Sequence, residues 1–212
     1  MQLAIDASAG PASVALFVDG TLVESRRIDR QGSAELLAPT VAEIVRAHQL
    51  SARSLTDVIV GGGPGSFTGL RVAAALGKGL ARGAGATLFS VPSLPLIAVA
   101  DSAASPGHYL CVLDALRGEW FVQLATRLPD GTWVIDAVVE RLAVQVVRDR
   151  AMALSAAIVG PPVDVMQQPD ARAAMAVRTT AVSLDAWEPD YGRLAEAQVV
   201  WEATHARPLS SA

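Results

Sequence analysis

A glycine-rich segment between an apolar run and a helical pattern constrains the fold of this chain more than any other feature. Four glycines between positions 61 and 65 follow the apolar run Val58–Val60 and precede a stretch rich in alanine and glycine. Glycine permits positive φ angles and close approach of two backbones, and Ser66 is a candidate N-cap for the following helix. The pattern predicts a strand, a tight loop and a helix whose first N–H groups could face an anion such as phosphate.

The loop does not match the two common phosphate-binding motifs. A Walker loop has Lys and then Ser or Thr directly after its last glycine, whereas Leu70 and Arg71 follow Gly69. The dinucleotide fingerprint requires a third glycine where this chain has Ser66. Two interpretations therefore stay open, a phosphate-binding turn and a tight turn that is needed only for packing.

Composition restricts the class of protein. The 212 residues are 51% hydrophobic and 18% charged, which suffices for one large domain or two small lobes, and the apolar surplus favours a protein interface. The formal net charge of −4 argues against strong direct binding of nucleic acid. Cys111 is the only cysteine and no apolar stretch is long enough to span a bilayer, so we expect a soluble, cytoplasmic protein.

The first hundred residues predict one lobe. Apolar runs at 3–5, 14–18 and 21–23 predict three antiparallel strands. Helical spacing from Ser33 to His48 predicts an amphipathic helix, with Ser33 as N-cap and Pro39 as a kink or late start. A strand at 58–60, a helix at 65–82 and a strand at 87–91 complete the lobe, and by analogy this order is that of a ribonuclease-H-like lobe of the actin superfamily.

A small, polar segment at 100–107 that ends in Pro-Gly is the best candidate for a linker. Apolar runs at 109–113, 120–125 and 133–139 then predict a meander in a second lobe. The expected fold is α/β, with two actin-like lobes whose mixed sheets are flanked by helices. The predicted division is 1–100 for the first lobe, with the glycine loop, and 101–212 for the smaller second lobe.

Residues 61–71 closely resemble the signature G-x-G-P-G-S-F-T-G-L-R of the TsaB (YeaZ) family. The segment 5–8 is similar to the D-T-S opening of that family, with Ala7 in place of Thr, and 114–121 is similar to its D-A-R-R-G-E-V-Y hairpin, with Leu116 in place of an arginine. Residues 189–193 are similar to the closing P-x-Y-x-R segment, so the resemblance spans nearly the whole chain.

The resemblance implies a function in forming threonylcarbamoyladenosine in tRNA. Family members are partners of TsaD, a threonylcarbamoyl transferase of the same actin-like fold, and a TsaE-type ATPase is expected beside them. TsaD carries an H-x-x-x-H pair for its metal, whereas His48, His108 and His205 are isolated here. We therefore expect a non-catalytic subunit without a metal or cofactor that activates a TsaD-type transferase and forms a homodimer when alone.

The same resemblance suggests where nucleotide would bind. In ATP-using relatives the acidic residue of the first turn orients metal-bound phosphate, a role that would fall to Asp6. The expected nucleotide-contacting residues are Asp6, Ser8, Gly63 and Gly65. The alternative is that Asp6 only caps a turn, and the absence of a hydroxyl at Ala7 favours that alternative.

The helix after the glycine loop is apolar on two faces, so one face can cover a sheet and the other requires a second helix. Either a partner supplies that helix, or both faces are covered within the subunit, partly by the helix at 33–48. We expect the first case, with these interface residues: Leu37, Val41, Ile44, Val45, Val72, Leu76, Gly79 and Gly83. Alternative functions are a free-standing ATP-dependent kinase or acyltransferase and, last, a glycoprotease-like hydrolase.

The isolated chain should bind Mg-ATP weakly and hydrolyse little of it, because the loop lacks a following lysine and Asp6 lacks a second visible carboxylate to hold metal. Titration calorimetry with Mg-ATP measures the affinity. A dissociation constant below about 1 μM, or roughly −8 kcal/mol, would support the kinase-like alternative instead.

Overall fold

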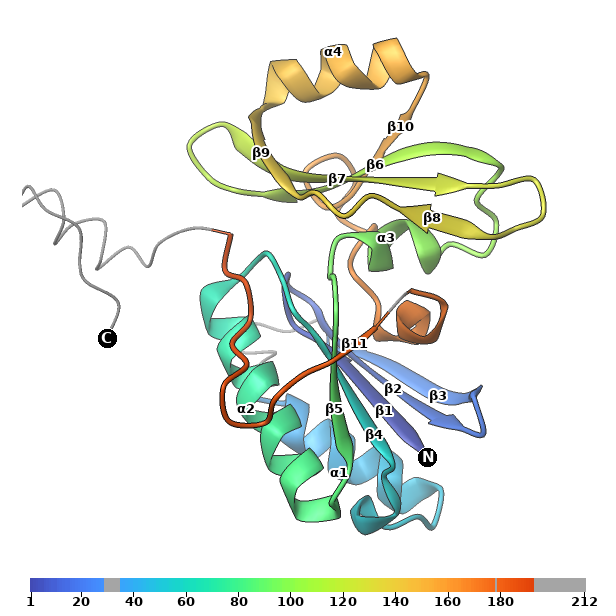
Figure 1. Cartoon of the computed structure of the whole chain (residues 1–212), viewed down its shortest axis with the longest axis vertical. Helices are drawn as coiled ribbons and strands as arrows, with labels where there is room; N and C mark the ends of the chain where they lie inside the picture. Colours follow the sequence, from blue (N-terminus) through green and yellow to red (C-terminus); the bar gives the residue numbers. More distant parts are fainter. Residues whose placement is uncertain (29–34, 178, 193–212) are drawn as a thin grey trace, which may run out of the picture.

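Two mixed sheets with helices against them form the described part of a computed structural model, residues 1–28, 35–177 and 179–192 (Figure 1). The first sheet has six strands in the order β11-β5-β4-β1-β2-β3. They are β1 (Gln2–Asp6), β2 (Ala12–Val18), β3 (Thr21–Ile28), β4 (Asp57–Gly61), β5 (Thr87–Val91) and β11 (Thr180–Ala181). The strands β1, β4 and β5 are parallel, whereas β2 and β11 run antiparallel to their neighbours.

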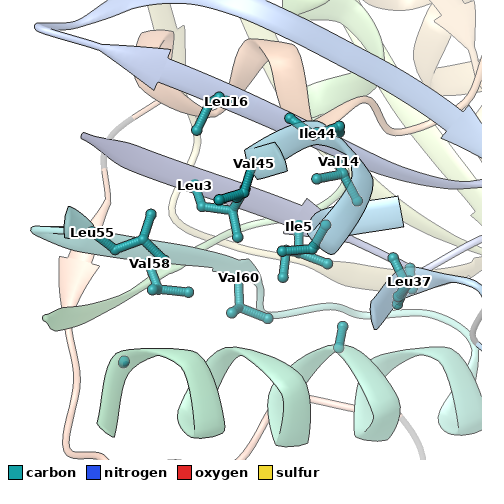
Figure 2. Packing of buried hydrophobic residues seen from close by; sticks show 14 of the residues in the cluster. Leu3, Ile5, Val14, Leu16, Leu37, Ile44, Val45, Leu55, Val58 and Val60 are labelled. Carbon is teal, nitrogen blue, oxygen red and sulfur yellow. The ribbon is translucent and has the colours of Figure 1, made fainter. Parts of the chain in front are cut away.

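Both faces of the first sheet are buried, and side chains alternate between two cores. Helices α1 (Leu37–Ala47) and α2 (Phe67–Ala84) cover one face, where Leu3, Ile5 and Val60 meet residues of α1 (Figure 2). On the other face, Ala4 and Ile59 pack against the short 3₁₀ helix η2 (Ala171–Ala176). The period of two along these strands thus supplies both cores.

The second sheet has its own pair of cores. It has the order β10-β6-β7-β8, with β9 paired to β7. The strands are β6 (Gly107–Asp114), β7 (Glu119–Arg127), β8 (Trp133–Ile135), β9 (Glu140–Ala143) and β10 (Ala157–Val159). Helix α4 (Val144–Leu154) packs on one face through Val147, and α3 (Pro95–Val99) packs on the other through Ile97. Because Leu96 of α3 also lies in the core under the first sheet, α3 joins the two lobes.

Most predicted elements are confirmed, and two start signals behave as proposed. Helix α1 begins at Leu37, so Pro39 lies in its first turn, where backbone N–H groups have no partner within the helix. This is the late start that Pro39 predicts, whereas the proposed cap Ser33 lies outside the described residues. At α2, the Oγ of Ser66 accepts a hydrogen bond from the Gly69 N–H at 3.3 Å, as expected of an N-cap.

The division at residue 100 requires a correction, because the chain returns to the first lobe. Helix η2 packs under the first sheet, and β11 pairs with the outer edge of β5. The segment 182–192, which we name the strap, then runs along α2 toward the glycine loop (Figure 1). The predicted range 101–212 therefore contains the second lobe and also a segment that belongs to the first lobe. Local sequence patterns do not reveal such a return of the chain.

Within the described residues, none of the helices combines the length and apolar character required to cross a bilayer.

Two glycines of α2 should respond in opposite directions to the same substitution. A Cβ at Gly77 would collide with Val60 of β4, whereas a Cβ at Gly79 meets nothing within 4 Å. We expect Gly77→Ala to lower the free energy of unfolding by about 1–3 kcal/mol through overpacking. Gly79→Ala should raise it by about 0.5–1 kcal/mol, because alanine favours the helix. Chemical denaturation of both variants measures this difference, and equal effects would refute the close approach of α2 to β4.

Candidate functional site

Asp6 ends β1 directly beneath the glycine loop. Its carboxylate accepts hydrogen bonds from the Ser8 backbone N–H at 3.0 Å, the Ser8 Oγ at 2.7 Å and the Ser93 Oγ at 2.7 Å. All three residues are at most 2% exposed. Burial raises the pKa of Asp6 above its ordinary value, although the hydrogen bonds from Ser93 and Ser8 act in the opposite direction. We name Asp6, Ser8 and Ser93 the buried carboxylate cluster.

The glycine loop is held against this cluster by its own backbone. The N–H of Gly63 donates to the Ser93 Oγ at 3.1 Å, and the N–H of Ser66 donates to the Ser8 carbonyl at 2.6 Å. A Cβ at Gly65 would collide with that carbonyl of Ser8, and one at Gly63 would collide with the carbonyl of Asp190 in the strap. The close approach of these backbones requires glycine.

The structure thus brings the four expected nucleotide-contacting residues, Asp6, Ser8, Gly63 and Gly65, into one cluster. The Asp6 carboxylate and the Gly63 N–H both have hydrogen-bond partners within the chain, namely Ser8 and Ser93. The packing interpretation of the loop accounts for each of these contacts, and nucleotide binding stays a prediction.

Half of the predicted partner interface requires a correction. Leu37, Val41, Ile44 and Val45 of α1 are at most 7% exposed and pack against the first sheet in the core of the chain itself (Figure 2). Helical spacing identified the apolar face of α1 correctly but could not tell an inward face from one that awaits a partner. These four side chains are therefore not available to a second protein.

The other four predicted interface residues lie on α2 and separate into two pairs. Val72 and Leu76 are half-buried and pack against the same core as α1, so this face is partly covered within the subunit. Gly79 and Gly83 are exposed, and nothing lies within 4 Å of a Cβ built on either one. Together with the exposed Ala75 they form a row at intervals of four residues, which we name the small-residue face.

The strap occupies the flank of α2 that lies away from α1. The Lys78 Nζ donates to the Glu188 carboxylate at 3.2 Å, and Arg82 forms an ion pair with Asp185. Further along, the ring of Tyr191 lies 4.6 Å from that of Phe67. Sequence reasoning missed the strap, although its acidic and aromatic residues, such as Asp185, Glu188 and Tyr191, were the available signal.

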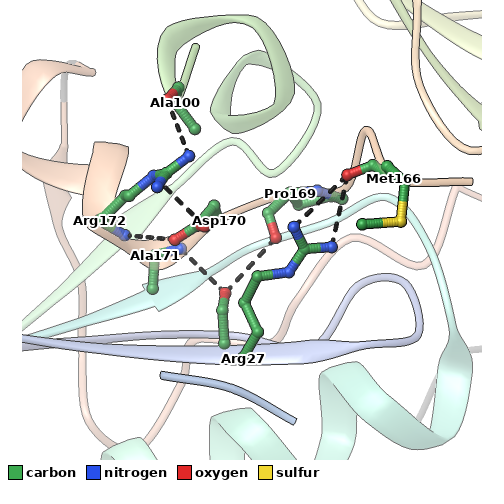
Figure 3. A network of polar contacts seen from close by, with 8 residues as sticks. Arg27, Ala100, Met166, Pro169, Asp170, Ala171 and Arg172 are labelled. Carbon is green, nitrogen blue, oxygen red and sulfur yellow. Dashed lines mark hydrogen bonds and ion pairs between the residues drawn. The ribbon is translucent and has the colours of Figure 1, made fainter. Parts of the chain in front are cut away.

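A second polar network joins the lobes on another side of the molecule. Arg27 donates to the Met166 carbonyl, and Arg172 donates to the Ala100 carbonyl at 3.0 Å and pairs with Asp170 at 3.4 Å (Figure 3). The two arginines line a cavity of about 240 Å³. Because these hydrogen bonds run to backbone carbonyls of neighbouring segments, we assign the network to holding the segments together.

Other reactive groups are dispersed or buried. In residues 1–28, 35–177 and 179–192, no group of three or more His, Cys, Asp or Glu side chains is arranged to hold a metal ion. Burial raises the pKa of the Cys111 thiol to about 12, which keeps the thiol protonated at neutral pH. The His48 ring pairs with Glu24 at 2.7 Å, and the hydrogen bond from Arg26 lowers the pKa of that glutamate.

Comparison with known proteins gives consistent results. Residues 27–160 match the family model described as TsaD: tRNA N6-adenosine threonylcarbamoyltransferase. The tRNA threonylcarbamoyladenosine biosynthesis protein TsaB of Escherichia coli is 30% identical over 154 residues, which cover 72% of this chain and 67% of that protein. The protein of the same description from Bacillus subtilis is 28% identical over 123 residues, 58% of this chain and about half (53%) of that protein.

Solved structures show the same fold. YeaZ from Pseudomonas aeruginosa superimposes with a TM-score of 0.74 at 21% identity, over 90% of this chain and 98% of that one. A second structure, described as a protein with similarity to peptidase YeaZ from Pseudomonas aeruginosa, superimposes with a TM-score of 0.75 at 23% identity, over 91% and 99%.

The raised pKa of Asp6 predicts a pH dependence of stability. Between its ordinary value of 3.8 and the folded value, the folded chain binds more protons at Asp6 than the unfolded chain. The free energy of unfolding of the wild type relative to Asp6→Asn should therefore fall as pH rises above about 4, by up to about 1.4 kcal/mol per unit. Denaturant titrations across pH 4 to about 8 measure the difference. Ser93→Ala keeps the carboxylate and should keep the decline, and parallel profiles of wild type and Asp6→Asn would contradict the assignment.

Proposed function

This chain belongs to the TsaB (YeaZ) family, and from that premise we propose that it is the partner subunit of a TsaD-type threonylcarbamoyl transferase. The relatives are named for the biosynthesis of threonylcarbamoyladenosine in tRNA, and the match to residues 27–160 supports the same process for this chain. We infer two actin-like lobes, in keeping with the strand order β3-β2-β1-β4-β5 and the helices that cover the first sheet.

The small-residue face of α2 is the observation that carries this proposal. A glycine within a helix costs about 1 kcal/mol relative to alanine, so two exposed glycines require a compensating use. Gly77 has one within the chain, namely close contact with β4, but nothing in the described part of the chain approaches Gly79 or Gly83. Glycine on an exposed helix face lets a second helix pack at short interaxial distance. A helix of the partner supplies the compensating contact.

Helix α1 extends this surface beside α2. Its inward side chains fill the core, and the exposed residues include Ala38 and Ala42. Small exposed side chains on both neighbouring helices would let a pair of helices from another protein approach closely. The revised interface therefore consists of outward residues of α1 and α2, in place of the inward residues of α1.

The buried carboxylate cluster supports a non-catalytic role. Asp6 is the acidic residue that would orient metal-bound phosphate in an ATP-using relative, and here it accepts three hydrogen bonds from Ser8 and Ser93. Activity then belongs to the TsaD-type subunit, which this chain holds in an active arrangement. A TsaE-type ATPase in the same complex and a homodimer of the free chain remain predictions.

Mixing the purified chain with the TsaD-type subunit of the same organism tests the proposal. Size-exclusion chromatography with light scattering at about 10 μM of each should report a heterodimer, since an interface of ordinary size has micromolar or stronger affinity. Separate elution of the two proteins would overturn the proposed function.

The variants Gly79→Gln and Gly83→Gln should separate stability from association. Glutamine favours the helix more than glycine does, so each substitution should raise the free energy of unfolding by about 0.5–1 kcal/mol. In the complex, the added side chain would separate the two helices, and we expect a loss of at least about tenfold in affinity for the TsaD-type subunit. Calorimetry measures the affinity, and denaturation measures the stability.

The matched control is Ala153→Gln on α4, an exposed helical position of the second lobe. It should leave the affinity unchanged. If both glycine variants bind as tightly as the wild type, the small-residue face is not the interface.

A further inference from the structure

The strap borders the small-residue face for most of the length of α2. It starts beside β5, where the Val182 N–H donates to the Leu88 carbonyl, and it ends at the glycine loop, where the Asp190 N–H donates to the Gly62 carbonyl at 2.8 Å. Gly192 then lies against Phe121 of the second lobe and against Pro64. The strap thus has anchored ends and lies along α2 between them.

The residues of α2 that contact the strap lie next to the small-residue face around the helix axis. At 100° per residue, Gly79 is about 60° from Arg82 and about 100° from Lys78 around the helix axis. Both basic residues contact the strap, through Asp185 and Glu188 respectively. A helix that packs on Gly79 and Gly83 would therefore have α1 on one side and the strap on the other.

Surface ion pairs do not by themselves explain these contacts. The Glu188 and Asp185 side chains are 69% and 85% exposed, and exposed pairs of this kind contribute little to stability in water. The Lys78 side chain is only 22% exposed, and its ammonium group also lies 5.9 Å from the centre of the Trp187 ring. A protein that covers this region would exclude water from the pairs and strengthen them.

We propose that the strap is the second wall of the partner-binding surface, so that the TsaD-type subunit binds tightly only when residues 182–192 are docked along α2. The inference rests on the proposed function and adds the element that completes the binding surface. The pairs Lys78–Glu188 and Arg82–Asp185 hold the strap in register with the helix. The partner is a protein whose packed helix contacts the small-residue face and the strap together.

A charge-reversal cycle on Lys78 and Glu188 tests the inference. The variants are Lys78→Glu, Glu188→Lys and the double exchange, each measured in the full-length chain by calorimetry with the TsaD-type subunit. Each single variant should lose about fivefold or more in affinity, and the double exchange should recover to within about twofold of the wild type. Hydrogen exchange over 182–192 should rise in the single variants, and it should fall in the wild type when the partner is added.

Arg141→Glu is the matched control, because Arg141 pairs with Glu119 at 3.0 Å on the second lobe. It should not change the affinity. Single variants that loosen the strap but bind like the wild type would overturn the inference and leave the proposed function intact. A second result would also overturn the inference: Lys78→Glu loses affinity, Glu188→Lys alone keeps it, and the double exchange does not restore it. Lys78 would then contact the partner directly. Failure of the wild type to bind would instead refute the proposed function, and the inference with it.

Discussion

The close packing of the glycine loop on the end of β1 is the contact on which the arrangement of the other elements depends. The Asp6 carboxylate accepts from Ser93, and Ser93 in turn accepts from the Gly63 N–H, so one buried chain of hydrogen bonds connects β1, the loop and the start of α3. Each of these groups would be costly to bury without a partner, by about 1–3 kcal/mol. Since α3 lies in the cores of both lobes, the cluster helps to fix one lobe relative to the other.

The same contact sets the direction of α2. The Ser66 N–H bonds to the Ser8 carbonyl, and the helix starts at the next residue, Phe67. From there α2 crosses β4 so closely that Gly77 leaves no room for a side chain. A helix fixed at its start and pressed on the sheet presents one constant outward face, on which Gly79 lies exposed. Rigid support of this kind is what a protein interface requires to bind without reorganising.

Much of the fold could be predicted from the sequence, because local signals determine its elements. The cap at Ser66 and the late start at Pro39 each act within a few residues and are found where the sequence predicts them. The resemblance to one family also predicted the likeness to the YeaZ structures. The return of the strap to α2 was missed, because it depends on contacts more than 100 residues apart, such as Lys78 with Glu188.

The candidate site was predicted less well, for a related reason. An apolar helix face has the same spacing whether it covers its own sheet or awaits a partner, so Ile44 and Val45 could not be told from interface residues. Likewise, the sequence does not show whether a loop glycine faces a phosphate or a carbonyl oxygen. Only the structure shows that Gly65 faces Ser8 and that Gly79 faces open space.

A phosphate at the glycine loop would compete with the chain for its own hydrogen bonds. To donate to a phosphate, the Gly63 N–H would have to leave Ser93, whose hydroxyl also holds the Asp6 carboxylate. The new anion would then lie close to a buried carboxyl group, and two negative charges at short distance inside a protein repel strongly. Each broken bond would cost about 1 kcal/mol before any was regained from the ligand. The loop that resembles a phosphate site is thus hydrogen-bonded through Ser93 to an internal carboxylate, and these bonds fix the point from which α2 starts.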